Sequence, residues 1–214
     1  MTRSVRSTLA IALSASVIGV GAAAQSSAPQ PKSAGSQNAD QVIASWKPTP
    51  QDVAQKMIAK YGQPQEITAN RLVWHNNGPW KYSELVNEEV AHEFPMPHKD
   101  ALRQVINYKI AADKADELLA YDGSLILERT KGEISARCDK EDANFLAINL
   151  ADDVATGRRS VEDARKFYAD TMMAFVKENK KNDYLQGFRF QVASRDLGDR
   201  DKPFEAVGTA GRKK

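Results

Sequence analysis

WHNNGPWKYSELVNEEVAHEFPMPH, residues 74–98, decides the fold of this chain of 214 residues. The stretch holds all three histidines, two of the three tryptophans and three of the nine prolines. Near its start, Asn77-Gly78 can adopt the positive φ angles of a tight turn, and Pro79, which has no N–H to donate, lengthens that turn. Apolar and β-branched residues flank the turn on both sides. We therefore predict a β-hairpin whose strands cover residues 67–74 and 80–86.

The chain beyond this hairpin offers further short strands. Residues 90–94 are typical of a short edge strand, and the two prolines that follow keep residues 93–98 extended. Residues 102–110 fit both a strand and one face of a helix, and their alternation favours a strand. Residues 125–129 and 133–138 predict a second hairpin.

Helices are predicted from capping residues and from apolar residues spaced three and four apart. Thr49 followed by Pro50 indicates the start of a helix of about three turns, and Asp113 begins a shorter one. Asp139 and Ser160 each begin a longer helix with an apolar face wide enough to cover a sheet. Strands and helices occur in runs and not in strict alternation. This order favours an α+β fold, an antiparallel sheet of about four to six strands with helices packed on one face.

Composition divides the chain into four segments. Residues 1–24 are predicted to be a signal peptide, and residues 25–40, rich in Ser, Ala, Gln, Pro and Gly, a disordered leader. A single α+β domain is expected over residues 41–193, with a last candidate strand over 184–192. Residues 194–214 are charged and contain several glycines, which predicts a disordered tail.

The first residues have the three parts of a secretory signal peptide. Arg3 and Arg6 precede an apolar run from Leu9 to Val20, and three alanines end at Ala24. The apolar run is shorter than the roughly 20 residues that a membrane-spanning helix needs. We expect cleavage near Ala24, no transmembrane anchor afterwards, and a soluble protein that is periplasmic or secreted.

The charge of the exported chain excludes one class of partner. Removal of Arg3 and Arg6 leaves 28 basic residues against 28 acidic ones. A chain without a net positive field has no global electrostatic reason to bind nucleic acid. We therefore expect no nucleic-acid partner.

Cys138 is the only cysteine, so the chain cannot form an intramolecular disulfide. A small buried hydrophobic residue is the favoured interpretation, and a disulfide-linked homodimer or a nucleophile stays open. Arg137 precedes it, but neighbouring residues of a strand point to opposite faces. An activated thiolate is therefore not expected.

Aromatic residues around the first hairpin form a candidate binding surface, because rings with polar tips suit contacts with proteins, peptides or sugars. Trp74 and Trp80 also flank the turn at a spacing that suits packing within the hairpin, and this alternative stays open. The candidate binding residues are Trp74, His75, Trp80, Tyr82, His92, Phe94 and His98.

His92 and His98 lie among carboxylates of the kind that bind zinc with imidazole, namely Glu88, Glu89, Glu93 and Asp100. The familiar helical zinc motif needs histidines one turn apart, and the prolines before His98 break any helix. Extended residues at even spacing point to the same face, so the two imidazoles converge if the prolines permit. From sequence we predict no metal and no cofactor, and keep a hydrolase or metal-dependent enzyme as the alternative.

Other recognisable chemistry is missing from the sequence. It contains no glycine-rich phosphate loop, serine nucleophile elbow, paired CxxC, haem-attachment CxxCH or calcium loop. Glu128 and Glu133 in the second hairpin suit the two carboxylates of a glycosidase, although outward-facing ion pairs are the commoner use of such residues. No catalytic residue is predicted.

Two segments resemble bacterial secreted proteins to which no activity is assigned. They are PHKDALRQVINYKI (97–110) and DGSLILERTKGEISARCDKEDANFLAINLADD (122–153). The run Tyr61-Gly62-Gln63-Pro64, between a helix and a Trp-bearing strand, also resembles small envelope domains of the outer-membrane assembly lipoprotein type. The acylated cysteine of such lipoproteins is missing here. The working hypothesis is an exported periplasmic binding or envelope-accessory module.

Overall fold

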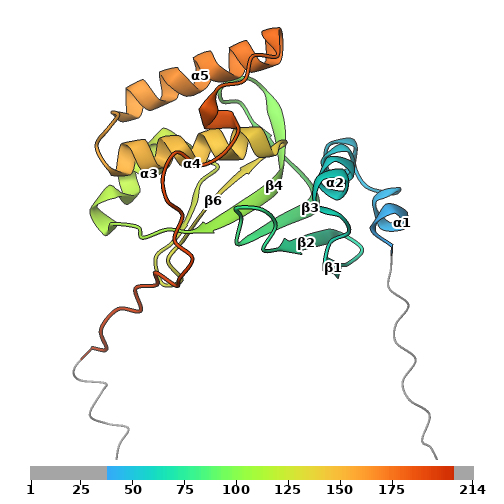
Figure 1. Ribbon diagram of the computed structural model, residues 1–214, viewed down its shortest axis with the longest axis horizontal. Coiled ribbons are helices and arrows are strands. Elements are labelled where there is room, and N and C mark those ends of the chain that lie inside the picture. The colour runs from blue at the N-terminus through green and yellow to red at the C-terminus, as the bar shows by residue number, and fades with distance from the viewer. Residues whose placement is uncertain (1–37, 205–214) are drawn as a thin grey trace, which may run out of the picture. The chain divides into compact units, whose positions relative to one another are not determined.

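An antiparallel sheet with the strand order β1-β2-β3-β4-β6-β5 lies at the centre of the protein (Figure 1). The computed structural model describes residues 38–204. The strands are β1 (Glu66–Ile67), β2 (Arg71–His75), β3 (Tyr82–His92), β4 (His98–Asn107), β5 (Ile126–Glu128) and β6 (Glu133–Cys138). The helices are α1 (Ala39–Ile43), α2 (Pro48–Tyr61), α3 (Ala115–Tyr121), α4 (Glu141–Ala155) and α5 (Val161–Glu178), with short 3₁₀ turns at Ala112–Lys114 and Asp183–Leu185.

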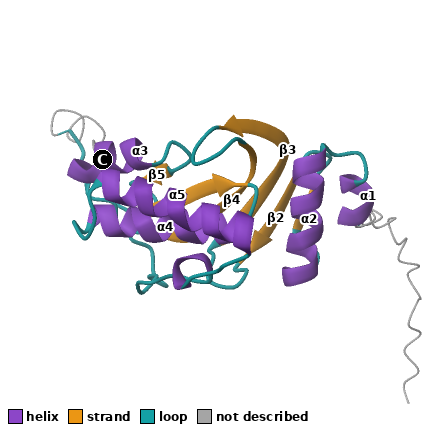
Figure 2. Cartoon of the chain, turned by 90° about the horizontal axis from the view of Figure 1, so that it is seen from above, coloured by secondary structure: helices purple, strands orange, loops and turns teal. Residues whose placement is uncertain are grey.

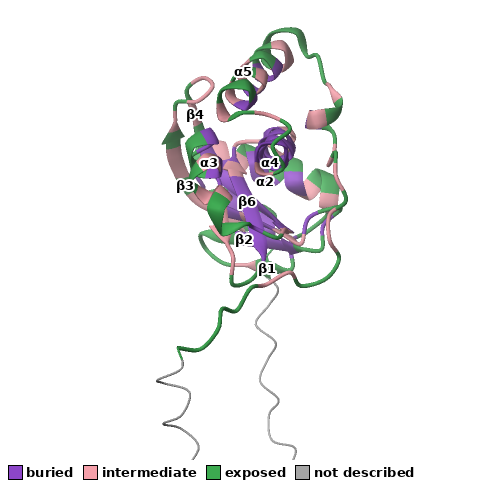
Figure 3. Cartoon of the chain, turned by 90° about the vertical axis from the view of Figure 1, so that its left-hand side faces the viewer, coloured by how far each residue is buried: buried purple, intermediate pink, exposed green. Residues whose placement is uncertain are grey.

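The helices cover one face of the sheet, as Figure 2 shows from above. Helix α2 packs on β3 and β4, α4 packs on β4 and β6, and α3 and α5 pack on α4. Twelve of the fifteen residues of α4 are buried, whereas the outer side of α5 is exposed (Figure 3). Leu102 and Ile106 are four residues apart in β4, so their side chains point to the same face of the sheet. Leu102 packs against α2 and Ile106 against α4. The α+β fold predicted from the sequence is confirmed.

Glu141 joins the two groups of helices through a buried polar network. Its Oε1 accepts hydrogen bonds from Tyr61 Oη at 2.5 Å, Trp80 Nε1 at 2.7 Å and Gln104 Nε2 at 3.2 Å. Its other oxygen pairs with Lys60. Burial raises the pKa of the Glu141 carboxyl, but the contacts with Lys60, Tyr61 and Trp80 outweigh it and hold the pKa below its ordinary value.

Three predicted helix starts differ from the structure. Asp113 lies in a 3₁₀ turn, and helix α3 begins at Ala115 with Lys114 at its N-cap. Helix α2 begins at Pro48, with Lys47 and not Thr49 at its N-cap. Helix α4 has Lys140 and not Asp139 at its N-cap, and a lysine side chain has no acceptor for the backbone amides. The Asp139 carboxylate instead accepts from Lys140 Nζ at 2.6 Å. The Ser160 cap of α5 is confirmed, since Ser160 Oγ accepts a bond from the Asp163 amide at 3.1 Å.

Two strand predictions differ from the structure. The segments predicted over 80–86 and 90–94 form parts of one strand, β3, whose register shifts between Leu85 and Val90. Strand β2 pairs with β3 only as far as Val86, so residues 90–92 pair with β4 alone and lie at an edge, as predicted. Residues 184–192 form no strand. The Asn149 side chain holds them by donating to the carbonyls of Tyr184 and Gly187 and by accepting from the Arg189 amide.

Part of the predicted disordered tail lies against the β5–β6 turn. The Asp199 amide donates to the Arg129 carbonyl at 2.9 Å, and the Arg129 side chain pairs with Asp199 and Asp201. Gly132 has a φ of +64°, and a Cβ there would lie 2.3 Å from the Leu197 carbonyl carbon, so this contact requires glycine.

The predicted signal peptide, its cleavage site, most of the leader and residues 205–214 lie outside the described residues. Within residues 38–204, no helix is long and apolar enough to cross a membrane.

Candidate functional site

The two tryptophans of the candidate binding surface are core residues. Trp74 and Trp80 are 0% and 2% exposed. Trp74 Nε1 donates to the Gly62 carbonyl at 2.9 Å, and Trp80 stacks on Phe145 of α4 with its N–H on Glu141. Their indole N–H groups form hydrogen bonds inside the protein. The two tryptophans therefore pack in the core, as the alternative interpretation proposed, and do not belong to a binding surface.

His75 and Tyr82 lie apart from the other candidate residues. His75 Nε2 is 2.6 Å from Glu66 Oε1, and the imidazole is about half exposed at the β1–β2 edge. Tyr82 lies opposite His75 in the β2–β3 register, and its ring is 5.9 Å from the Arg103 guanidinium. The sheet therefore separates these two residues from His92 and His98.

His92 and His98 face each other across the end of the β3–β4 hairpin. They are direct partners in the strand register, and their ring centroids lie 4.9 Å apart. Asp100, two residues after His98, points to the same side of β4. Its carboxylate lies between the imidazoles, with Oδ2 3.1 Å from His92 Nδ1 and Oδ1 3.1 Å from His98 Nε2.

These short distances are those of ion pairs when the imidazoles are protonated, but the two contacts do not meet hydrogen-bond geometry. Both His92 Nδ1 and Asp100 Oδ1 are buried and have no hydrogen-bond partner of acceptable geometry. The side chains of His92, His98 and Asp100 are only 19%, 14% and 5% exposed. Buried polar atoms without hydrogen-bond partners are costly and uncommon, and a bound ion is one of their recognised explanations.

A backbone carbonyl fixes the orientation of the His98 ring. Its Nδ1 lies 2.8 Å from the Met96 carbonyl oxygen, which can only accept, so Nδ1 carries the hydrogen. In the neutral ring this leaves the lone pair on Nε2, the atom that faces Asp100. A backbone carbonyl that fixes the ring of a histidine in this way is the usual second shell of a metal ligand.

Cys138 brings a sulfur atom to the same place from β6. Its Sγ is 3.5 Å from His98 Nε2, and the thiol is buried. Burial raises its pKa well above the ordinary value, with the Asp139 and Asp100 charges adding to this rise. A disulfide to a second copy would need two sulfurs about 2 Å apart. The buried position argues against the disulfide-linked homodimer and fits the predicted buried residue.

The three polar groups also shift one another's pKa. The Asp100 carboxylate raises the pKa of His92 despite the burial of the ring. Burial lowers the pKa of His98, but Asp100 and the Met96 carbonyl outweigh it, and the pKa is raised. Burial raises the pKa of Asp100, and the two imidazoles outweigh it and leave the pKa below its ordinary value.

Phe94, in the turn between β3 and β4, packs against α5. Its ring lies 5.3 Å from the ring of Tyr168, and the Arg165 guanidinium sits 3.9 Å above its centroid. Both partners belong to α5. The aromatic and cation–π contacts hold the segment between His92 and His98 against the helix layer. Of the seven candidate binding residues, His92, Phe94 and His98 thus share one place.

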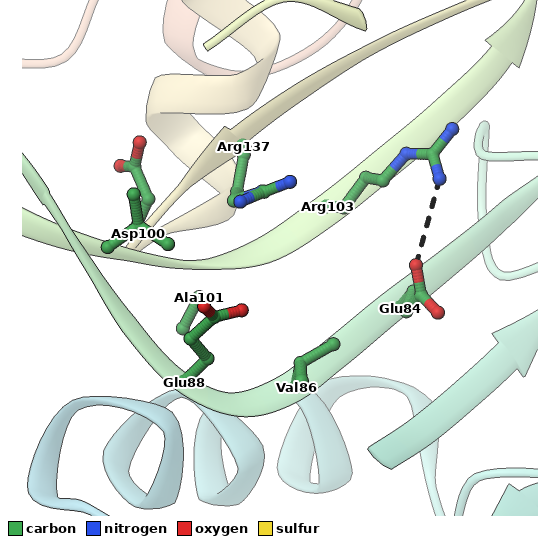
Figure 4. A pocket seen from close by; sticks show the side chains of 8 residues that line it. Glu84, Val86, Glu88, Asp100, Ala101, Arg103 and Arg137 are labelled. Atoms are coloured by element: carbon green, nitrogen blue, oxygen red, sulfur yellow. Dashed lines mark ion pairs between the residues drawn. The ribbon is translucent and has the colours of Figure 1, made fainter. Parts of the chain in front are cut away.

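A small hollow is lined by residues of β3, β4 and β6 (Figure 4). Its volume is about 80 Å³, and its charged groups include Glu84, Glu88, Arg103 and Arg137. Arg103 and Glu84 form an ion pair at 3.8 Å. The Asp100 carboxylate points to the other side of β4 (Figure 4). The hollow has room for only a few water molecules and carries balanced charges, so it is not a site for an organic substrate.

Glu128 and Glu133, the glycosidase alternative, are cross-strand partners held by lysines. Glu133 pairs with Lys81 at 2.7 Å, and Glu128 pairs with Lys131 at 3.3 Å. The outward-facing ion pair expected from the sequence describes Glu128, whose side chain is 37% exposed, but not Glu133, which is buried and whose Oε2 has no hydrogen-bond partner.

No family model, curated protein or solved structure matches this chain.

Proposed function

We propose that this protein is a periplasmic binding or envelope-accessory module whose ligand is a divalent transition-metal ion, held by His92, His98 and Asp100. One observation carries the proposal: buried imidazole and carboxylate atoms converge at 3.1 Å without hydrogen-bond geometry. Lone pairs that point at a common ion, and not at each other, have this arrangement. Sequence analysis predicted no metal here.

The distances support coordination. Tetrahedral zinc binds nitrogen and oxygen ligands at about 2.0 Å, which places two such donors about 3.3 Å apart. The two imidazole–carboxylate distances are both 3.1 Å, and the donor atoms of all three residues lie within 4.8 Å of one another. Only a small movement of the side chains would accommodate an ion.

The three ligand side chains have little access to solvent, which favours a site that binds an ion over a site that catalyses a reaction. The three side chains are largely buried beneath the hairpin end, which Phe94 fastens to α5. A hydrolase needs an open coordination position that a substrate can reach. The metal-dependent enzyme therefore ranks second to the binding module.

Export is the second part of the proposal. It rests on the sequence of residues 1–24 and agrees with the resemblance to bacterial secreted proteins. Protein recovered from the periplasm or medium should begin at Gln25 when its intact mass is measured. Recovery of the chain only from the cytoplasm, with residues 1–24 still attached, would contradict this part.

Metal content tests the binding part. The full chain, expressed without a metal-affinity tag, should carry close to one zinc or other transition-metal ion per molecule by elemental analysis. His98→Ala should lose this ion, because the substitution removes one of its three ligands. His75→Ala is the matched control, since His75 binds Glu66 on another part of the sheet, and it should retain the ion. Equal metal content in all three proteins would refute the proposal.

A further inference from the structure

We infer that Cys138 is the fourth ligand of this site, which then takes a metal that accepts thiolate, such as Zn²⁺, in preference to Mg²⁺ or Ca²⁺. The inference rests on the proposed metal-binding function and goes beyond it, because it assigns the complete ligand set and the class of metal. Thiolate selects zinc and softer cations, whereas magnesium and calcium require oxygen ligands.

The position of the sulfur carries this step. Strand β6 pairs with β4, with Cys138 opposite Leu102, so the thiol lies on the same side of the sheet as Asp100 and His98. In tetrahedral zinc sites a sulfur ligand at about 2.3 Å lies about 3.5 Å from a nitrogen ligand at about 2.0 Å. The Cys138 Sγ to His98 Nε2 distance is 3.5 Å.

His98 Nε2 is the atom that joins the two sets of donors. It lies 3.1 Å from Asp100 Oδ1 on one side and 3.5 Å from Cys138 Sγ on the other. Asp100 Oδ1, in a side chain about 95% buried, has no hydrogen-bond partner of acceptable geometry. The donor atoms form two groups that share His98, namely His92, His98 and Asp100, and His98, Cys138 and Asp139. A bound ion would draw the sulfur toward the unsatisfied atoms of the first group.

Asp139 is the competing fourth ligand, and its contacts exclude it. It lies 3.4 Å from Cys138 Sγ, but both of its oxygens are 2.6 Å from Lys140 Nζ. A carboxylate neutralised by lysine is a poor ligand for a cation, whereas Asp100 faces two imidazoles that can be neutral. On metal binding, the Cys138 S–H bond breaks, its proton goes to solvent, and the thiolate electron pair forms the bond to the metal.

Cobalt substitution tests the ligand set. The Co²⁺ complex of the wild-type protein should show the ultraviolet absorption of a sulfur-to-cobalt transfer and the strong visible bands of tetrahedral cobalt. Cys138→Ser should still bind Co²⁺ through the other three residues, should lose the sulfur absorption, and should bind Zn²⁺ at least about tenfold more weakly. His75→Ala should reproduce the wild-type spectrum and affinity.

The wild-type protein provides a second measurement that requires no substitution. X-ray absorption at the zinc edge should show one sulfur at about 2.3 Å beside nitrogen and oxygen at about 2.0 Å. A zinc complex with nitrogen and oxygen only, or an unchanged cobalt spectrum in Cys138→Ser, would overturn this inference while leaving the three-ligand site in place. Failure of the wild-type protein to bind either ion would overturn the proposed function as well.

Discussion

Saturating Zn²⁺ is expected to raise the melting temperature of the protein by roughly 10 °C. A ligand that binds only the folded state, present at 1,000 times its dissociation constant, adds about 4 kcal/mol to the free energy of unfolding. Each kcal/mol corresponds to about 2–4 °C for a domain of this size. The ion would also hold β3, β4 and β6 together, because His92, Asp100 and Cys138 come from these three strands.

Asp100→Asn is the sharpest variant for this prediction. The amide keeps the shape of the carboxylate but lacks its charge, so the shift with Zn²⁺ should fall to about 2 °C or less. His75→Ala should shift as the wild-type protein does. Thermal unfolding followed by circular dichroism, with and without Zn²⁺, measures all three. A shift in Asp100→Asn equal to that of the wild-type protein would show that zinc binds elsewhere.

Glu141→Ala is expected to lower the free energy of unfolding by about 3 kcal/mol or more. The substitution leaves the N–H of Trp80 and the hydroxyl of Tyr61, both buried or partly buried, without their acceptor. Each such group costs about 1–3 kcal/mol. Denaturant unfolding measures the loss. Asp142→Asn, at the next position, removes a partly exposed pair with Lys181 and should cost about 1 kcal/mol or less. Similar losses in the two variants would contradict the role of the network.

The same carboxylate predicts a dependence on pH. Its pKa in the folded protein lies below the ordinary value of 4.5, so the stabilisation is present above pH 4.5 and is lost as the pH falls through the folded-state pKa. Stability should therefore decline more steeply on acidification in the wild-type protein than in Glu141→Gln. If the free energy of unfolding fell equally steeply with pH in both proteins below pH 4.5, Glu141 would not contribute to the loss of stability in acid.

Local patterns were sufficient to predict most elements of the fold. The turn before β3, the alternation along residues 102–110 and the Ser160 cap are signals that a few neighbouring residues determine. In that turn Asn76 and Gly78, and not Asn77, have positive φ angles. The errors arose where distant residues decide. Strand β3 extends to His92 because β4 pairs along it, and residues 184–192 stay irregular because Asn149 of α4 binds their backbone.

The candidate site was partly predictable. The even spacing of His92 and His98 indicated that they can share a face, but the sequence offered four nearby carboxylates and no means of choosing Asp100. Cys138 was interpreted as a separate buried residue because 40 residues separate it from His98, and only the β4–β6 register brings them together. Trp74 and Trp80 were wrongly included among the binding residues, because an indole whose N–H is hydrogen-bonded suits a protein core as well as a surface.

The position of a bound ion tests the central claim most directly. Crystals of the wild-type protein grown with Zn²⁺, measured on both sides of the zinc absorption edge, should show one anomalous peak about 2.0 Å from His92 Nδ1, His98 Nε2 and an Asp100 oxygen. The metal-binding account predicts this peak beneath the β3–β4 hairpin end. Zinc peaks found only at His75 or at exposed carboxylates, with none between these three residues, would contradict it.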